Sequence, residues 1–244
     1  MRKSIIDIHT HTVVSGHAYS TFSENVSHAL KSNMEILGIS DHAPTMPGSV
    51  GMLHFTNFSV LPKEINGLQI IMGCELNIMD TKGTVDLPKS VIEKLDYTIA
   101  SLHPPCIPVD TAQDYTQTLI NTIKNPLINI IGHPGDPRYP FNIKEVVSCA
   151  RDNNTVLELN NTSLNPNNGR AGGEKIIIDI LKECKKQDFP IIIGSDAHYH
   201  TAIGDFSRAE KLLEETDFPF ELVLNYNKDK FKEFINFVKG RKIL

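Results

Sequence analysis

Side chains that can bind a metal or transfer a proton follow each of seven short apolar runs in this chain. If the runs are parallel strands, their carboxyl ends meet at one edge of the sheet, where the active sites of α/β folds form. We therefore expect these polar residues to converge, although they are far apart in the sequence. The segments are Asp7-Ile-His9-Thr-His11, Ser40-Asp41-His42, Gly73-Cys74-Glu75, His103-Pro104, Gly132-His133-Pro134-Gly135, Glu158-Leu-Asn160-Asn161 and Gly194-Ser195-Asp196-Ala-His198.

Local spacing favours metal binding. His9 and His11 are two residues apart, as are Asp196 and His198, so each pair faces one way on an extended segment. Imidazole and carboxylate donors without thiolate suit zinc, manganese or iron(II), and one catalytic zinc needs only about three or four ligands. The candidates exceed that number, which predicts more than one divalent metal. They are His9, His11, His17, His42, Glu75, His103, His133, Asp196 and His198.

The remaining histidines show the contrast. A single buried histidine is more often a core or capping residue than a ligand, but seven of the ten histidines fall at strand ends or in adjoining loops. His28 lies inside a predicted helix, His54 lies in an irregular loop, and His200 could line the mouth of the site. We assign no ligand role to these three. Cys74 is expected in the core, not as a nucleophile.

The elements that must position these residues alternate between short apolar runs and helical segments. This alternation predicts an α/β fold with a parallel sheet buried on both faces, either a barrel or a doubly wound sheet. The strands are expected at Ile5–Ile8, Ile36–Ile39, Leu68–Met72, Tyr97–Leu102, Leu127–Ile131, Val156–Leu159 and Phe189–Ile193. The helices are expected near 23–34, 111–124, 143–153, 173–187, 205–215 and 228–240.

Capping motifs and loop composition refine these boundaries. Thr111 precedes Asp114 by three residues and Asn142 precedes Glu145 by three, a spacing that predicts a helix start at each place. Residues 43–60 and 161–173 are rich in Gly, Pro, Asn, Thr and Ser and are expected to be long loops. No linker or repeat interrupts the chain, so we expect residues 1–244 to form one domain.

Composition excludes several classes of protein. The 244 residues are 40% hydrophobic and 22% charged, an ordinary globular mix, and no apolar stretch is long enough to cross a bilayer. The four scattered cysteines form no CxxC pair, which favours a reducing cytoplasm. A formal net charge of -5 disfavours nonspecific binding to nucleic acid. An oligomer is compatible with these numbers.

These motifs resemble the PHP (polymerase and histidinol phosphatase) family. The resemblance rests on the Asp-x-His-x-His opening at Asp7, on Ser40-Asp41-His42, and on Gly194-Ser195-Asp196-Ala-His198. Within the family, three further blocks are similar to the YcdX group of small stand-alone PHP proteins, described as probable phosphatases. These blocks are His17-Ala-Tyr-Ser-Thr21, Gly-His133-Pro-Gly-Asp-Pro137 and Leu-Glu158-Leu-Asn-Asn161.

The resemblance implies a distorted, TIM-like (β/α)7 barrel that holds three metals, usually described as zinc. It implies one metal on His9, His11, Glu75 and Asp196, a second on Glu75, His103 and His133, and a third on His17, His42 and His198. Glu75 would bridge two of them. The loop around Asn165–Gly173 has no firm match, which leaves the substrate open.

The expected activity is hydrolysis of a small phosphomonoester by metal-activated water, a phosphatase reaction. Glu75 and Asp196 are expected to serve the reaction as ligands. Asp7 and Asp41 are expected to orient ligand imidazoles, although Asp41 could instead cap a turn. Arg138 and Arg170 could bind phosphate, although solvated surface positions are common for arginine.

Three alternatives remain open at this point. Histidinol-phosphate phosphatase would use the same fold and chemistry on another substrate. A nuclease acting on nucleotides or single-stranded ends would need a basic or aromatic track. A noncatalytic metal-binding PHP module would fit a chain with missing ligands, whereas here every ligand position of the motif is present.

Overall fold

The computed structural model describes residues 4–239. Their strands form a four-stranded sheet and a five-stranded sheet. In the first sheet β1, β2 and β4 are parallel, and the short β3 pairs antiparallel with the edge of β4. In the second sheet, β5 to β9 are parallel and follow one another in chain order. The bounds are β1 Ile6–Asp7, β2 Ile36–Ile39, β3 Glu64–Ile65, β4 Leu68–Met72, β5 Glu75–Asn77, β6 Ile99–Ser101, β7 Ile130–Ile131, β8 Val156–Asn160 and β9 Ile191–Gly194.

Two isolated parallel bridges join these sheets into a ring. His42 pairs with Glu75 just beyond β2, and Thr10 pairs with Ala197 just beyond β1 and β9. Only Gly73 and Cys74 separate β4 from β5, so these two strands together occupy one strand position of the barrel. Among the described residues, the parallel strands therefore occupy seven strand positions. This confirms the expected α/β fold and resolves the choice between barrel and doubly wound sheet in favour of a distorted barrel.

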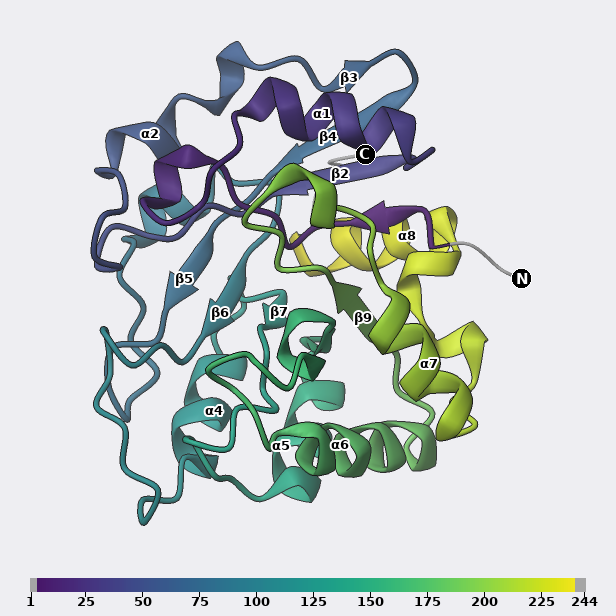
Figure 1. Cartoon of the computed structure of the whole chain (residues 1–244). Helices are drawn as coiled ribbons and strands as arrows, with labels where there is room; N and C mark the ends of the chain where they lie inside the picture. Colours follow the sequence, from purple (N-terminus) through teal and green to yellow (C-terminus); the bar gives the residue numbers. More distant parts are fainter. Residues whose placement is uncertain (1–3, 240–244) are drawn as a thin grey trace.

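Helices surround this ring of strands (Figure 1). α4, α5 and α6 pack side by side, and α1 lies across the face of the first sheet. Within residues 4–239, no helix has both the length and the apolar character that a membrane span requires. The helices are α1 Phe22–Lys31, α2 Leu53–Thr56, α3 Lys89–Ile92, α4 Thr116–Ile123, α5 Ile143–Asp152, α6 Glu174–Lys186, α7 Ser207–Glu215 and α8 Lys228–Lys239.

The six predicted helices are all present, and one of the two predicted starts is wrong. Asn142 caps α5 by accepting the N–H of Glu145, as expected. The helix predicted from 111 begins instead at Thr116, because the carboxylate of Asp114 accepts the N–H and hydroxyl of Thr116. The predicted end of α8 at residue 240 lies outside the described residues.

The two segments expected to be long loops contain short helical turns. Residues 43–60 hold α2 and the 3-10 turn Phe58–Val60, and residues 161–173 hold the 3-10 turn Thr162–Leu164. Buried aromatic side chains explain the first case, since Phe55 is 1% exposed within α2. Hydrophobic burial thus organises a segment whose composition alone predicted irregular structure.

The seam between β1 and β9 depends on one side chain below the Thr10–Ala197 bridge. The amide of Asn225 donates to the carbonyls of Ile6 and Ile193, each at 2.8 Å, and its Oδ1 accepts the N–H of Ile193 at 2.7 Å. Asn225 is fully buried. It therefore supplies, from outside the sheet, hydrogen bonds that an adjacent strand would otherwise provide.

Replacing Asn225 with alanine should lower the free energy of unfolding by about 2 to 4 kcal/mol, because a buried N–H and two carbonyls lose their partner. Urea unfolding followed by circular dichroism measures this change. The exposed Asn167 is the matched control, and Asn167→Ala should change stability by less than about 0.5 kcal/mol. Equal stability of the two variants would show that Asn225 does not hold the seam.

Candidate metal centre

Glu75 lies at the centre of a cluster of imidazoles. It is fully buried on β5, and its two carboxylate oxygens face different histidines. Oε1 is 3.4 Å from His9 Nε2, 3.2 Å from His103 Nε2 and 3.0 Å from His133 Nε2, whereas Oε2 is 2.7 Å from His42 Nδ1 and 3.6 Å from His11 Nε2. This carboxylate is positioned to serve more than one ligand set.

Asp196 forms the second acidic group of the cluster. Its Oδ1 is 3.6 Å from His9 Nε2, 3.3 Å from His11 Nε2 and 3.5 Å from His198 Nδ1. The backbone conformation is unusual at two of these residues, since Asp196 has a φ of 57° two residues after the end of β9, and His133 has a φ of 31° two residues after the end of β7. Such φ values are unfavourable outside glycine and concentrate at functional sites.

The outer part of the cluster contains His17 and His198. The ring centroid of His17 is 4.9 Å from that of His42 and 4.7 Å from that of His198. His17 is exposed and His198 is partly buried, whereas the other seven candidate ligands are buried. The structure therefore brings all nine predicted ligand residues together, with one edge open to solvent.

Several donor atoms in this cluster are buried without a hydrogen-bond partner. They are His9 Nε2, His11 Nε2, both ring nitrogens of His42, and Glu75 Oε2. His42 Nδ1 and Glu75 Oε2 approach to 2.7 Å, but their contact lacks hydrogen-bond geometry. Buried polar atoms without partners are costly, and a divalent cation would satisfy them. The donor set therefore fits metal binding.

The distances between donor atoms define three overlapping groups. In each group the ligand atoms all lie within 4.8 Å of one another. The groups are His11, His42 and His198; His9, His11 and Asp196; and His42, Glu75 and His103. Shared members mean that neighbouring metals would lie close together.

The electrostatics differ among the candidate ligands. Burial raises the pKa of Glu75, but the imidazoles of His103, His42 and His9 outweigh it and hold that pKa well below its usual value. Burial lowers the pKa of His103 to about 4. Burial also lowers the pKa of His9, but the carboxylates around it outweigh burial and hold that pKa well above its usual value. Because ligands bind metals in their deprotonated forms, a metal on His9 would displace a proton.

Hydrogen bonds behind the cluster fix two ligand rings. The Nδ1 of His103 is 2.7 Å from Asn77 Oδ1, and the Nδ1 of His11 is 3.1 Å from the hydroxyl of Ser15. That hydroxyl donates to Asp41 at 2.7 Å. Asp41 thus reaches His11 through Ser15, in keeping with its expected orienting role, and both rings present Nε2 to the cluster.

Asp7 has different partners from those expected. Its carboxylate accepts the backbone N–H groups of His9, Ser195 and Gly204, with no imidazole contact among the described residues. Burial raises the pKa of Asp7 to about 6. Asp7 therefore stabilises the backbone at His9 and at Ser195, the residue before Asp196.

Sequence reasoning assigned no role to Glu158, which contacts two ligand residues. Its carboxylate is 2.6 Å from His9 Nδ1 and accepts the N–H of His133 at 2.7 Å. The sequence did place Glu158 at the end of an apolar strand, within the Leu-Glu158-Leu-Asn-Asn161 motif that resembles the PHP family. Nothing local in the sequence indicates the partners, because His9 is 149 residues away.

The two arginines differ in their surroundings. Arg170 extends from the loop that lacked a firm match, and its NH1 is 2.9 Å from Asp196 Oδ2. Arg138 is paired with Asp136 through its Nε and NH2, the latter at 2.6 Å. Among the described contacts, only Arg170 touches a candidate ligand.

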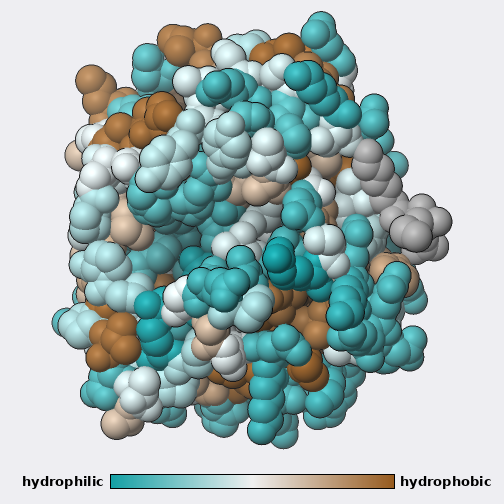
Figure 2. Space-filling view, in the orientation of Figure 1, coloured by the Kyte–Doolittle hydropathy of each residue, from teal (hydrophilic) through white to brown (hydrophobic). Residues whose placement is uncertain are grey.

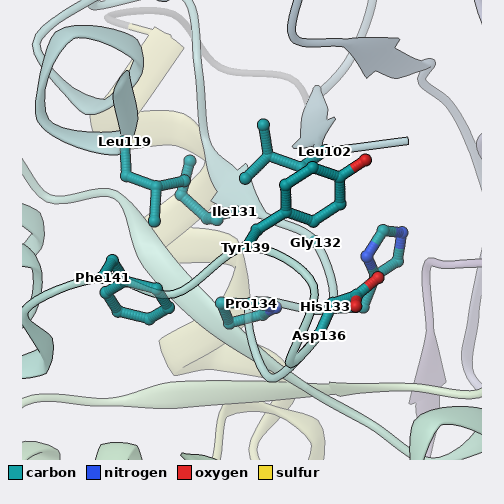
Figure 3. Close-up of a pocket in the computed structure, with 9 residues that line it drawn as sticks. All are labelled: Leu102, Leu119, Ile131, Gly132, His133, Pro134, Asp136, Tyr139 and Phe141. Carbon is teal, nitrogen blue, oxygen red and sulfur yellow. The ribbon is translucent and has the colours of Figure 1, made fainter. Parts of the chain in front are cut away.

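A small cavity of about 10 Å³ lies beside His133 and Asp136. Figure 3 shows both side chains on one side of it, with Leu119, Ile131 and Phe141 toward the other. This volume holds about one water molecule, so the cavity cannot hold a substrate. By contrast, the face seen in Figure 2 is hollowed near its middle, and hydrophilic residues line that hollow.

The other three histidines contact residues outside the nine candidate ligands. His200 hydrogen-bonds Ser20 through its Nδ1, and its ring is 5.6 Å from that of His28. The ring of His54 packs edge-on against Phe55 and Phe58, with its Nε2 3.9 Å from Asp41. None of the three is in a donor group among the described residues.

The chain is similar to a known protein family and to several known proteins. The model of the PHP domain family matches residues 7–165. A probable phosphatase of Clostridium novyi is 41% identical, with 96% of this chain and 95% of that protein covered. A probable phosphatase of Caldicellulosiruptor saccharolyticus is 44% identical, with 98% of each covered.

A solved structure has a similar fold. It is histidinol phosphate phosphatase from Lactococcus lactis, complexed with zinc, L-histidinol and phosphate. The TM-score is 0.61 and the sequence identity is 17%, with 88% of this chain and 95% of that chain covered.

Proposed function

This chain belongs to the PHP domain family, and we propose that it is a phosphatase that hydrolyses small phosphomonoesters at a cluster of three divalent metals. The observation that carries the proposal is the set of buried, unpartnered donor atoms around Glu75. Relatives named as probable phosphatases along nearly the whole chain support the reaction class.

Three ligand sets account for the nine residues. His9, His11, Glu75 and Asp196 would hold one metal, Glu75, His103 and His133 a second, and His17, His42 and His198 a third. Glu75 Oε1 is 3.4 Å from His9 Nε2 of the first set and 3.2 Å from His103 Nε2 of the second, which supports a bridging role. Zinc fits this mixture of imidazole and carboxylate, and manganese or iron(II) would also fit.

Bound metals would activate water near neutral pH and neutralise charge on the phosphoryl oxygens. The protein's own part is to hold the ligands in fixed orientations and to supply cationic groups. Arg170, at 2.9 Å from Asp196, is the better placed arginine for a phosphoryl oxygen. Arg138 is less available, because Asp136 already holds its guanidinium at Nε and NH2.

A small substrate fits the charge of the protein. The net charge is -5, and long nucleic acids require several basic groups. The four cysteines are free in this structure, which supports a reducing compartment, and we place the protein in the cytoplasm. We also propose that residues 1–244 form a single domain.

Glu75→Gln should reduce kcat on p-nitrophenyl phosphate by at least about 100-fold, because losing one charge disturbs two metals at once; this equals about 2.7 kcal/mol on the barrier. Steady-state kinetics with added zinc measures it. The control is Glu93→Gln, since Glu93 is exposed and pairs only with Lys89 among the described ion pairs. Turnover of the Glu75 variant within about threefold of the parent would contradict the bridging role.

The KM for a small phosphomonoester should change by less than about twofold between about 50 and 200 mM potassium chloride, because few phosphate charges are bound. The assay compares p-nitrophenyl phosphate, histidinol phosphate and a single-stranded oligonucleotide across that salt series. Higher kcat/KM on the oligonucleotide, with a KM that rises about tenfold or more with salt, would reassign the protein as a nuclease. A strong preference for histidinol phosphate would narrow the substrate to that ester.

A further inference from the structure

Glu158 is a buried carboxylate for which the proposed reaction has no direct use. Its side chain is 1% exposed, and it lies on β8, between β7 and β9 in the ring. A charged group in such a place is costly unless its oxygens are fully hydrogen-bonded. Its partners therefore indicate its role.

Each oxygen of Glu158 holds a different candidate ligand. Oε1 lies 2.6 Å from His9 Nδ1, and Oε2 accepts the backbone N–H of His133 at 2.7 Å. Oε2 also accepts the side-chain amide of Asn160 at 3.1 Å, and that amide reaches Asp196 at 3.3 Å. One carboxylate thus joins the segments that follow β1, β7 and β9.

The space for this carboxylate depends on Gly194 at the end of β9. A Cβ at this position would collide with Glu158 Oε1 and press on the Cβ of His9. The absence of a side chain lets the carboxylate pass beneath His9.

Both contacts act on ligand geometry. Because Nδ1 of His9 is held by Oε1, Nε2 is the nitrogen that faces Glu75 and Asp196. The bond to the N–H of His133 stabilises a backbone with a φ of 31°, and this places His133 Nε2 3.0 Å from Glu75.

We propose that Glu158 is a positioning residue that couples two of the metals, by orienting His9 for one and His133 for the other. This inference rests on the proposed ligand sets, in which these two histidines serve different ions. Asn77 provides the contrast, because the only candidate ligand with which it shares a described hydrogen bond is His103. Loss of Asn77 should therefore weaken one metal, whereas loss of Glu158 should weaken two.

Glu158→Gln tests the coupling with little change in size. Either orientation of the new amide places an NH2 group against a donor, at His9 Nδ1 or at the His133 N–H. Full-length parent and variants would be equilibrated with buffered zinc and analysed for zinc per chain. Metal affinity should fall about 10- to 100-fold at each affected site, so that Glu158→Gln retains about one zinc where the parent retains three, and Asn77→Ala retains about two.

Far-UV circular dichroism and thermal unfolding check that each variant folds. If Glu158→Gln does not fold, Glu158→Asp replaces it, because the shorter side chain keeps the charge but cannot reach both partners. A merely structural role would lower the unfolding temperature and leave three zinc ions bound at unchanged affinity, which would overturn the proposal. Loss of only one zinc, as in Asn77→Ala, would also overturn it.

The parent protein separates this inference from the proposed function. A parent that binds three zinc ions and hydrolyses p-nitrophenyl phosphate, with a Glu158→Gln variant of equal zinc content, refutes the coupling alone. A parent that binds at most one zinc ion refutes the trinuclear centre and the coupling together.

Discussion

The burial of the Glu75 carboxylate among five imidazoles is the constraint on which the rest of this structure depends. Removing a carboxylate from water is strongly unfavourable unless opposite charge and hydrogen bonds replace the lost hydration. The imidazoles lower the pKa of Glu75, yet they leave its Oε2 and several ring nitrogens without partners. A divalent cation would satisfy both kinds of group at once, so the interior of the ring fits a metal centre.

The strands of the ring end where the candidate ligands begin. Six strands of apolar residues end at or just before a segment that contains a candidate ligand. Gly73 and Cys74 separate β4 from β5, so that Glu75 is the first residue of β5. The isolated bridges that close the ring involve Thr10 and Ala197, next to candidate ligands, and the candidate ligands His42 and Glu75 themselves. Backbone strain occurs at the same edge, at His133 and Asp196. The contacts that close the ring therefore lie at the same edge of the sheet as the candidate site.

Much of this could be predicted from the sequence, and the limits have physical causes. Strands such as Ile36–Ile39 and Leu68–Met72 were predicted to the residue, because buried strands carry continuous apolar runs. The start of α4 was missed because the Asp114 carboxylate binds Thr116 and not an earlier N–H. The partners of Glu158 and the contact between Arg170 and Asp196 depend on the tertiary fold, which no local pattern encodes. The sequence also predicted the nine candidate ligands, and the structure brings these residues together. Their division among three metals stays a proposal.

The most direct test of the central claim is a crystal structure of zinc-loaded protein with anomalous diffraction measured on both sides of the zinc absorption edge. The account predicts three anomalous peaks inside the cluster, with the carboxylate of Glu75 between two of them and with His17, His42 and His198 around the third. A single peak, or peaks that Glu75 does not contact, would contradict the claim that this buried carboxylate organises the site.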